Sequence, residues 1–326
     1  MLKKTIRRLG ALAMVLAMAV SVFAVNASAA GAVNESKTVT ITKNIAADAN
    51  VRVPGATYTF TIAAGAADSA RNIYAGEMDA ISQAANNITF TEGDEESSKS
   101  TTFTITAEKF TKPGIYRYTV TETANPLPDG MTLASAKTLL VYVEQVNGVN
   151  SIAAVIVDGV DEKDKTDFTF TNTYDTNNVT VKKVISGNQA NMSGEWEFEI
   201  TVTGQTGEKF ATSKDGVVLE SGVPTKVKLG HNQTITIYGL SAKDTYTVKE
   251  TYANTDGYET KIDGVKTTTG ETSGNAAEKD VSIEYENKKE IATPGGVIMT
   301  IAPYAMIVVL AGAFAVVFLS RRNRAE

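Results

Sequence analysis

Short stretches in which apolar and polar residues alternate recur along most of the chain. Examples are residues 37–43 (KTVTITK), 58–62 (YTFTI), 115–122 (IYRYTVTE) and 168–172 (FTFTN). Successive side chains of a strand point to opposite faces, so each stretch predicts a strand with one buried and one exposed face. Many short strands separated by turns predict a β-sandwich.

The other elements of the first half are less regular. The pair Asn147-Gly148 lies between apolar stretches at 138–145 and 152–157, which is a strong signal for a β-hairpin. Residues 78–85 predict one or two helical turns. Residues 93–100 predict an acidic, serine-rich loop.

The second half of the chain repeats the plan of the first. Its motifs VTVKKV (179–184), YTVKE (246–250) and IEYEN (283–287) echo VTITKN (39–44), YTVTE (118–122) and FTFTN. Further strands are predicted at 195–202, 225–229, 234–238 and 258–262, with a polar loop at 270–279. The protein is therefore predicted to be all-β, with two tandem Ig-like β-sandwich domains at 31–175 and 176–290.

In each half of the chain, three strands carry one polar residue each on a face that is otherwise apolar. A lysine ends the first strand, a glutamate ends a middle strand and an asparagine ends the last strand. These residues are Lys43, Glu122 and Asn172 in the first half, and Lys183, Glu250 and Asn287 in the second. Burying such groups without a partner is costly. The same three residue types in the same order predict a shared role.

These groups suit the formation of an amide between the lysine and the asparagine. Burial disfavours the charged form of an amine, so a buried lysine becomes a nucleophile. The asparagine offers a carboxamide carbon, and a glutamate of raised pKa polarises it and relays protons to the departing ammonia. The alternative is ordinary buried hydrogen bonding. Lys182 is a competing amine, but its register faces solvent.

Both ends of the chain carry segments directed to a membrane. Residues 1–30 have a basic start, an apolar stretch and the sequence Ala27-Ser28-Ala29, which is typical of a cleaved secretory signal, the alternative being an uncleaved anchor. Residues 297–319 are apolar and long enough to span a bilayer, and three arginines follow. The region between these segments is therefore predicted to lie outside the cell.

The composition of the chain excludes several classes of function. The two ends carry seven of the 31 cations and one of the 37 anions, which leaves a net charge of −12 between them. Such an acidic surface argues against nucleic-acid binding. The chain has no cysteine and one histidine, so thiol catalysis and disulfides are excluded, and we expect no metal or other cofactor. The only chemistry we expect is the chain's reaction with itself.

With these motifs, the chain resembles the two-domain major (backbone) pilins of Gram-positive bacteria, which are built from pilin isopeptide-linkage domains. The resemblance is carried by TVTITKN, PGIYRYTVTE, FTFTNT, VTVKKVISG, YTVKE and IEYENKKE, and by TPGGVIMTIAPY near the C-terminus. It implies that Lys43 forms an isopeptide bond with Asn172, with Glu122 as the proton relay. It implies the same for Lys183 and Asn287, with Glu250 as the relay.

The resemblance also implies that residues 291–326 form a cell-wall sorting signal, made of a motif, a transmembrane helix and a basic tail. In the family, a sortase cuts the motif and joins the new carboxyl end to an amine. The matching motif is Thr293-Pro294-Gly295-Gly296, in which Gly295 stands where the family has threonine. Because of this difference, the motif does not identify which sortase recognises it. Lys165 matches the linking lysine of the family, and Lys163 is the alternative.

The sequence therefore predicts a structural subunit of a covalently polymerised pilus, anchored to the cell wall and supporting adhesion. The expected partners are other copies of the chain, a sortase, peptidoglycan and a ligand on a host surface. The alternative is a monomeric adhesin, anchored to the wall or the membrane, that uses the same domains as a stalk.

Overall fold

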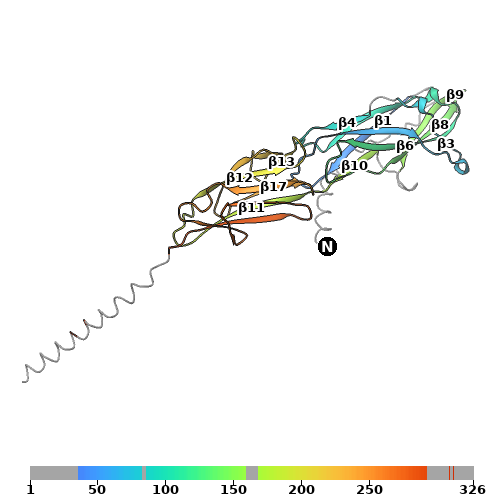
Figure 1. Ribbon diagram of the computed structural model, residues 1–326. Coiled ribbons are helices and arrows are strands. Elements are labelled where there is room, and N and C mark those ends of the chain that lie inside the picture. Colours follow the sequence, from blue (N-terminus) through green and yellow to red (C-terminus); the bar gives the residue numbers. More distant parts are fainter. Residues whose placement is uncertain (1–35, 83–85, 159–167, 292–307, 309–310, 312–326) are drawn as a thin grey trace, which may run out of the picture.

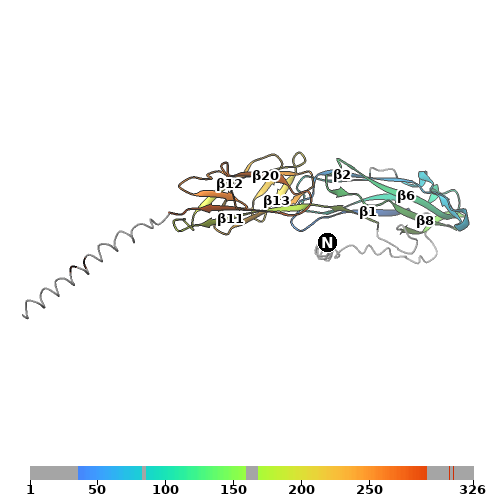
Figure 2. The same ribbon diagram turned by 60° about the horizontal axis from the view of Figure 1, so that its bottom comes forward.

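The described part of the protein consists of two β-sandwiches arranged end to end (Figures 1 and 2). The computed structural model describes residues 36–82, 86–158, 168–291, 308 and 311. Two separate hydrophobic cores, one in each sandwich, confirm the predicted all-β fold with tandem domains.

The first sandwich is built from two sheets, one of four strands and one of six. Its strands are β1 (Lys37–Ala46), β2 (Ala56–Ala64), β3 (Ile73–Ala75), β4 (Asn87–Phe90), β5 (Ser98–Ile105), β6 (Gly114–Asn125), β7 (Met131–Thr132), β8 (Lys137–Val146), β9 (Val149–Asp158) and β10 (Thr169–Tyr174). Three short 3-10 helices connect them: η1 (Ser69–Arg71), η2 (Met78–Ala80) and η3 (Ala107–Lys109). The sheets have the orders β5-β1-β10-β7 and β4-β2-β6-β8-β9, with β3 also paired to β6.

The second sandwich has a five-stranded sheet, a four-stranded sheet and a small two-stranded one. Its strands are β11 (Asn177–Ser186), β12 (Glu195–Thr203), β13 (Lys209–Ala211), β14 (Val218–Glu220), β15 (Thr225–Gly230), β16 (Thr234–Leu240), β17 (Thr245–Glu250), β18 (Glu259–Ile262), β19 (Val265–Lys266), β20 (Glu271–Asn275) and β21 (Val281–Lys288). The orders are β16-β11-β21-β18-β19, β15-β12-β17-β20 and β13-β14.

The first and last strands of each sandwich lie side by side and run parallel. In the first sandwich β1 pairs with β10, and Ile45 lies opposite Asn172. In the second, β11 pairs with β21, and Ile185 lies opposite Asn287. Parallel neighbours cannot be joined by a hairpin, so the rest of each domain is folded between them.

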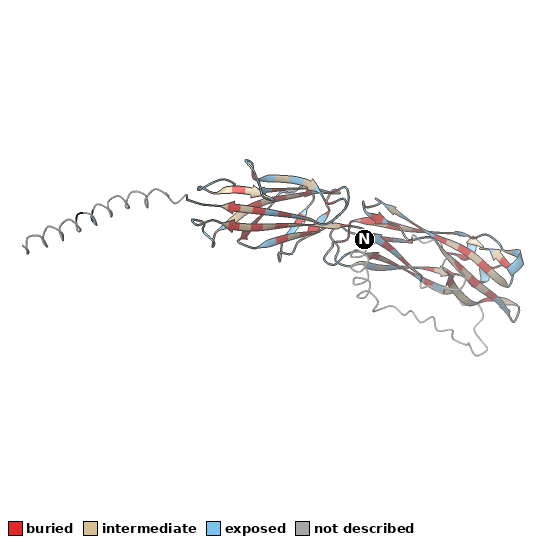
Figure 3. Cartoon of the chain, turned by 90° about the horizontal axis from the view of Figure 1, so that it is seen from below, coloured by how far each residue is buried: buried red, intermediate tan, exposed pale blue. Residues whose placement is uncertain are grey.

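Alternation along the strands places the cores as the sequence predicts. Buried and exposed positions alternate along most strands (Figure 3). In β1, Val39 and Ile41 are completely buried, and in β11 Val179 and Val181 are too. The predicted hairpin is also present, because Asn147 and Gly148 form the turn between β8 and β9 with φ angles of 51° and 84°.

Two predicted loops are partly strand. The polar loop predicted at 270–279 contains strand β20, which pairs with β17 at an exposed edge of its sheet. Backbone pairing with β17 holds this strand, so it needs no apolar face. The loop predicted at 93–100 ends in the first residues of β5, where backbone pairing with β1 holds the polar residues Ser98 to Ser100 in a strand. Within residues 78–85, the described part forms one helical turn, η2, as predicted, after which Ile81 pairs with Ile105.

Two polar contacts, one buried and one exposed to solvent, cross the junction between the sandwiches. Tyr174, at the end of β10, donates a hydrogen bond of 3.0 Å to Glu208 Oε1 of the second sandwich. Lys243 forms an ion pair with Asp129 across the same junction. Both Tyr174 and Glu208 are almost completely buried, so this contact is shielded from water.

The carboxyl group of Glu208 has a raised pKa because of its surroundings. Burial, followed by the nearby charge of Asp244, raises the pKa of Glu208 from 4.5 to about 7, and Glu92 of the first sandwich adds a smaller repulsion. The hydrogen bond from Tyr174 and one from the backbone of Gln205 act in the opposite direction. At pH 6 the folded protein therefore holds a proton on Glu208 that the unfolded chain does not.

This raised pKa predicts that stability falls as pH rises from about 4.5 to about 7, because the folded state binds more protons than the unfolded state in this window. The full contribution is at most about 3 kcal/mol. Glu208→Gln should remove most of this slope in the free energy of unfolding, measured by urea titration at several pH values. Glu220→Gln, at an exposed position of β14, is the control. An unchanged slope in Glu208→Gln would contradict the assignment.

Candidate functional site

The structure brings the six predicted polar residues into two buried clusters, one in each sandwich. The exposed fraction is 8% for Glu122 and 0% for the other five, which are Lys43, Asn172, Lys183, Glu250 and Asn287. Groups this polar are rarely buried unless they pair with one another. We call the clusters the first site (Lys43, Glu122 and Asn172) and the second site (Lys183, Glu250 and Asn287).

Strand register places each lysine beside its asparagine. Asn172 lies opposite Ile45 on the neighbouring strand, so Lys43, two residues earlier, points to the same face. Lys183 has the same offset from Ile185, the residue opposite Asn287. The two sites therefore share one backbone geometry.

The glutamates come from the facing sheets. Glu122 lies on β6, opposite Phe60 of β2, and Glu250 lies on β17, opposite Phe198 of β12. Each site therefore bridges the two sheets of its sandwich, with the lysine and asparagine on one side and the glutamate on the other.

In the first site the lysine amine and the carboxamide have separate partners. Lys43 Nζ lies 3.2 Å from Glu122 Oε1 and donates hydrogen bonds to the carbonyl oxygens of Asn44 (2.9 Å) and Phe170 (3.2 Å). Asn172 Oδ1 accepts a hydrogen bond of 2.8 Å from the backbone N–H of Ala134, in the loop between β7 and β8. This N–H draws electron density from the carbonyl carbon, which favours attack on it.

In the second site one carboxylate joins the two reacting groups. Lys183 Nζ donates to Glu250 Oε2 at 2.8 Å, and Asn287 Nδ2 donates to Glu250 Oε1 at 2.5 Å. Asn287 Oδ1 is buried and has no hydrogen-bond partner among the described residues. Glu250 is thus placed to move a proton from the amine to the nitrogen that leaves.

Burial shifts the proton affinities in the direction that amide formation needs. It lowers the pKa of Lys43 and that of Lys183 from 10.5 to about 8, even though a glutamate beside each lysine acts against the shift. Burial also raises the pKa of Glu122. A neutral, nucleophilic amine is therefore accessible near neutral pH.

Aromatic rings line both sites and exclude water. The ring centre of Tyr58 lies 4.9 Å from Lys43 Nζ, and that of Trp196 lies 5.0 Å from Lys183 Nζ. Tyr58 follows the apolar alternation of its strand, so the sequence pattern already placed it in the core. Ala134 carries no such signal, because only its backbone N–H contributes and the surrounding loop has no periodicity.

The remaining predicted residues lie outside the described part of the chain. They are Lys165, with its alternative Lys163, and the motif residues Thr293, Pro294, Gly295 and Gly296, together with the secretory signal and almost all of the predicted membrane span. In the residues that the structure does describe, no helix has the length and hydropathy of a membrane span. The described residues also contain no cluster of metal-binding side chains.

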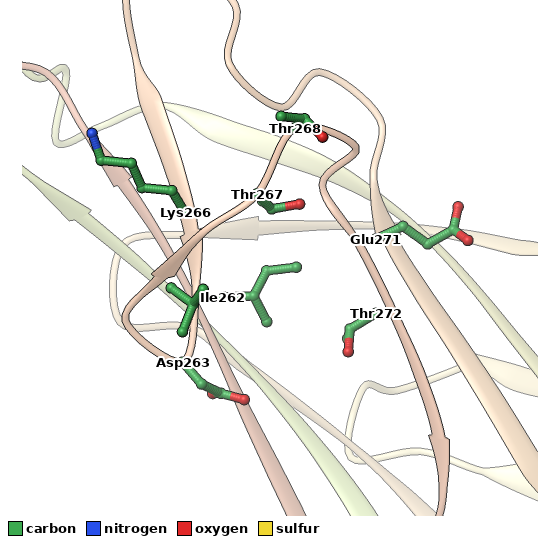
Figure 4. A pocket seen from close by; sticks show the side chains of 8 residues that line it. Ile262, Asp263, Lys266, Thr267, Thr268, Glu271 and Thr272 are labelled. Carbon is green, nitrogen blue, oxygen red and sulfur yellow. The ribbon is translucent and has the colours of Figure 1, made fainter.

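A separate pocket of about 500 Å³ lies in the second sandwich (Figure 4). It is open to solvent and lies between the β18–β19 hairpin and β20, with Ile262, Asp263 and Lys266 on one side and Glu271 and Thr272 on the other. None of the six site residues lines it, so it is not part of either cluster.

Comparisons with known proteins find a family match in each half of the chain. Residues 36–175 match the family described as Spy0128-like isopeptide containing domain, and residues 177–289 match a domain of unknown function, DUF7601. The first match therefore assigns an isopeptide containing domain to the first sandwich.

Individual relatives are more specific. The chain is 26% identical to a pilin of Streptococcus pyogenes serotype M1 over 316 residues, covering 89% of this chain and 92% of the pilin. The crystal structure of the major pilin from Streptococcus pyogenes matches with a TM-score of 0.57 and 22% identity, over 78% of this chain and 99% of that one. The major pilin T-13 of the same organism matches with a TM-score of 0.53 and 25% identity, over 78% of this chain and 97% of that one. These findings support a Gram-positive major pilin, as the sequence motifs predict.

The geometry of the second site predicts which of two adjacent lysines reacts. Lys182 is half-exposed and forms an ion pair with Glu284, whereas Lys183 is completely buried beside Asn287. If the predicted isopeptide bond forms in the second site, Lys183→Met should therefore retain the ammonia of that site and Lys182→Met should lose it. Intact mass of the two purified variants measures the difference, and the reverse pattern would refute the assignment.

Proposed function

We propose that the chain is the structural subunit of a covalently polymerised cell-surface pilus, and that each β-sandwich closes an isopeptide bond within itself. The similarity to pilins over most of the chain supports the subunit role, and pilin relatives imply association with further copies. The observation that carries the proposal is the buried lysine, glutamate and asparagine that recur with one geometry in both sandwiches.

The proposed reaction needs no other reagent. The neutral lysine nitrogen attacks the asparagine carbonyl carbon, a new C–N bond forms, and the bond from that carbon to Nδ2 breaks. One proton leaves the lysine nitrogen and one reaches Nδ2, so ammonia departs, and Glu122 or Glu250 carries the proton between them. The product is a neutral amide, which removes the cost of burying an amine.

The proposed bonds give each domain mechanical and thermal resistance. Each would join the first strand of a sandwich to its last, enclosing residues 43–172 and 183–287. By analogy with disulfides, closing loops of this length removes unfolded-chain entropy worth about 5 kcal/mol each. Tension that enters β11 and leaves through β21 would pass through the bond and bypass the strands between them.

Intact mass tests the proposed bonds directly. The mature ectodomain should be lighter than its sequence mass by two ammonia molecules. Glu122→Ala and Glu250→Ala should each restore one of them, because the remaining carboxyl serves only its own sandwich. Linked peptides after trypsin digestion should join Lys43 to Asn172 and Lys183 to Asn287. Glu286→Ala, at a half-buried carboxylate next to Asn287, is the control and should keep both bonds. A wild-type chain of full mass would overturn the proposal.

Polymerisation is the second part of the proposal. We infer that residues 291–326 direct the chain to a sortase through Thr293, Pro294, Gly295 and Gly296. The new carboxyl end would join Lys165 of another copy and, at the base of the fibre, peptidoglycan of the cell wall. We also infer the domain limits 31–175 and 176–290, and contact with a ligand on a host surface.

Cell-wall extracts distinguish this fibre from the alternative, a monomeric adhesin stalk. Boiling in SDS should leave a ladder of regularly spaced species, since amide links survive denaturation. Lys165→Arg should collapse the ladder to a single band, and Lys163→Arg should leave it intact. A single band from the wild-type strain would favour the adhesin stalk, and a ladder that survives Lys165→Arg would exclude this lysine as the joint.

A further inference from the structure

Tyr58 is a buried group in the first site that the reaction above does not use. Its exposed fraction is 0%, and its hydroxyl has no hydrogen-bond partner of good geometry among the described residues. Leaving a buried hydroxyl unpaired costs about 1–3 kcal/mol. Such a cost needs an explanation from the neighbours of the hydroxyl.

Those neighbours are the reacting groups. The Tyr58 ring lies beside Lys43 Nζ, and its hydroxyl interacts with the carboxylate of Glu122 and the side chain of Asn172. Asn172 Nδ2 and both oxygens of Glu122 also lack hydrogen bonds of good geometry, although Glu122 retains its ion pair with Lys43. Unsatisfied polar atoms of three residues therefore share one dry space.

The two sites differ in the aromatic residue beside the lysine and in the hydrogen bonds of the glutamate. Tyr58 lies two residues before Phe60, which is opposite Glu122, and Trp196 lies two residues before Phe198, which is opposite Glu250. The two aromatic residues thus occupy equivalent positions. In the second site the glutamate makes well-formed hydrogen bonds to the amine and to the carboxamide nitrogen. In the first site Glu122 interacts with Lys43 and Asn172 without a hydrogen bond of good geometry to either, which leaves the transfer to Asn172 Nδ2 open to the Tyr58 hydroxyl.

We propose that Tyr58 is a further catalytic residue of the first site, whose hydroxyl delivers the proton to Asn172 Nδ2 as ammonia leaves. This inference rests on the proposed isopeptide bond between Lys43 and Asn172. The backbone N–H of Ala134 holds Asn172 Oδ1 throughout, which stabilises the negative charge of the tetrahedral intermediate.

The proton transfers balance over the whole step. Glu122 takes one proton from the attacking nitrogen of Lys43. Tyr58 gives its proton to Nδ2 as the C–N bond breaks, and the Glu122 carboxyl returns a proton to the Tyr58 oxygen. Burial and the charge of Glu122 raise the pKa of Tyr58, so a free phenolate is unfavourable and the last two transfers occur together. Tyrosine and glutamate end unchanged.

The test compares the rates of the two bonds within one molecule. The full chain is made by cell-free synthesis and denatured at intervals, and mass spectrometry quantifies the linked peptides of the first and second sites. Tyr58→Phe should slow the first bond at least tenfold, a conservative loss for a general acid, and leave the second bond unchanged. The second bond serves as the internal clock.

Tyr118→Phe is the matched control, because Tyr118 is equally buried in the same core but bonds to the carbonyl oxygen of Glu77, away from the site. It should form both bonds at the wild-type rate. Folding is checked in a Lys43→Met background, where adding Tyr58→Phe should not lower the thermal transition, since the hydroxyl that it removes has no hydrogen bond of good geometry.

Three results would overturn the inference. The first is a wild-type rate for the first bond in Tyr58→Phe. The second is an equal slowing in Tyr118→Phe, and the third is a lowered thermal transition in the Lys43→Met background. If the wild-type chain forms both bonds, any of these three results overturns the role of Tyr58 but not the proposed function. A wild-type chain that forms neither bond would overturn both proposals together.

Discussion

The burial of a lysine amine between two facing sheets is the constraint on which the rest of this structure depends. An amine in that position must lose its charge, pair with a carboxylate or react. The parallel pairing of first and last strands brings the asparagine to the same face, and the facing sheet supplies the glutamate. The buried amine that is costly to fold therefore lies beside the groups with which it could react. The bond proposed here would permanently remove the cost of burying that amine.

The two sandwiches reach this arrangement with different hydrogen bonds. Around Lys183, a single carboxylate joins the amine to the carboxamide nitrogen. Around Lys43, a backbone N–H holds the carboxamide oxygen, and a tyrosine takes the place of a tryptophan. The shared backbone register sets which residues meet, whereas the local side chains set how protons move between them. The proposed reaction would therefore follow one plan in both domains and differ in its proton transfers.

The two domains also share an acidic junction. The sandwiches meet at a junction with buried carboxyl groups, one of which has a pKa of about 7. The acidic pair Glu208 and Asp244 belongs to the second sandwich, but Tyr174 and Glu92 of the first shape its environment. Proton binding at this joint is thus a property of the two domains together.

Much of this protein was determined by local sequence pattern. Alternation alone placed Lys43, Glu122 and Asn172 on apolar faces, because the side-chain period of a strand is two whatever the fold. The repeat of the same residue types then predicted a second site. The edge strand β20 was missed because a strand held by backbone pairing at a surface needs no apolar face. Only the tertiary structure decided that Ala134 and Tyr58 meet Asn172, and that Glu208 lies in a dry junction. Those contacts join segments far apart in the chain, and no local period records which loop or sheet will face them.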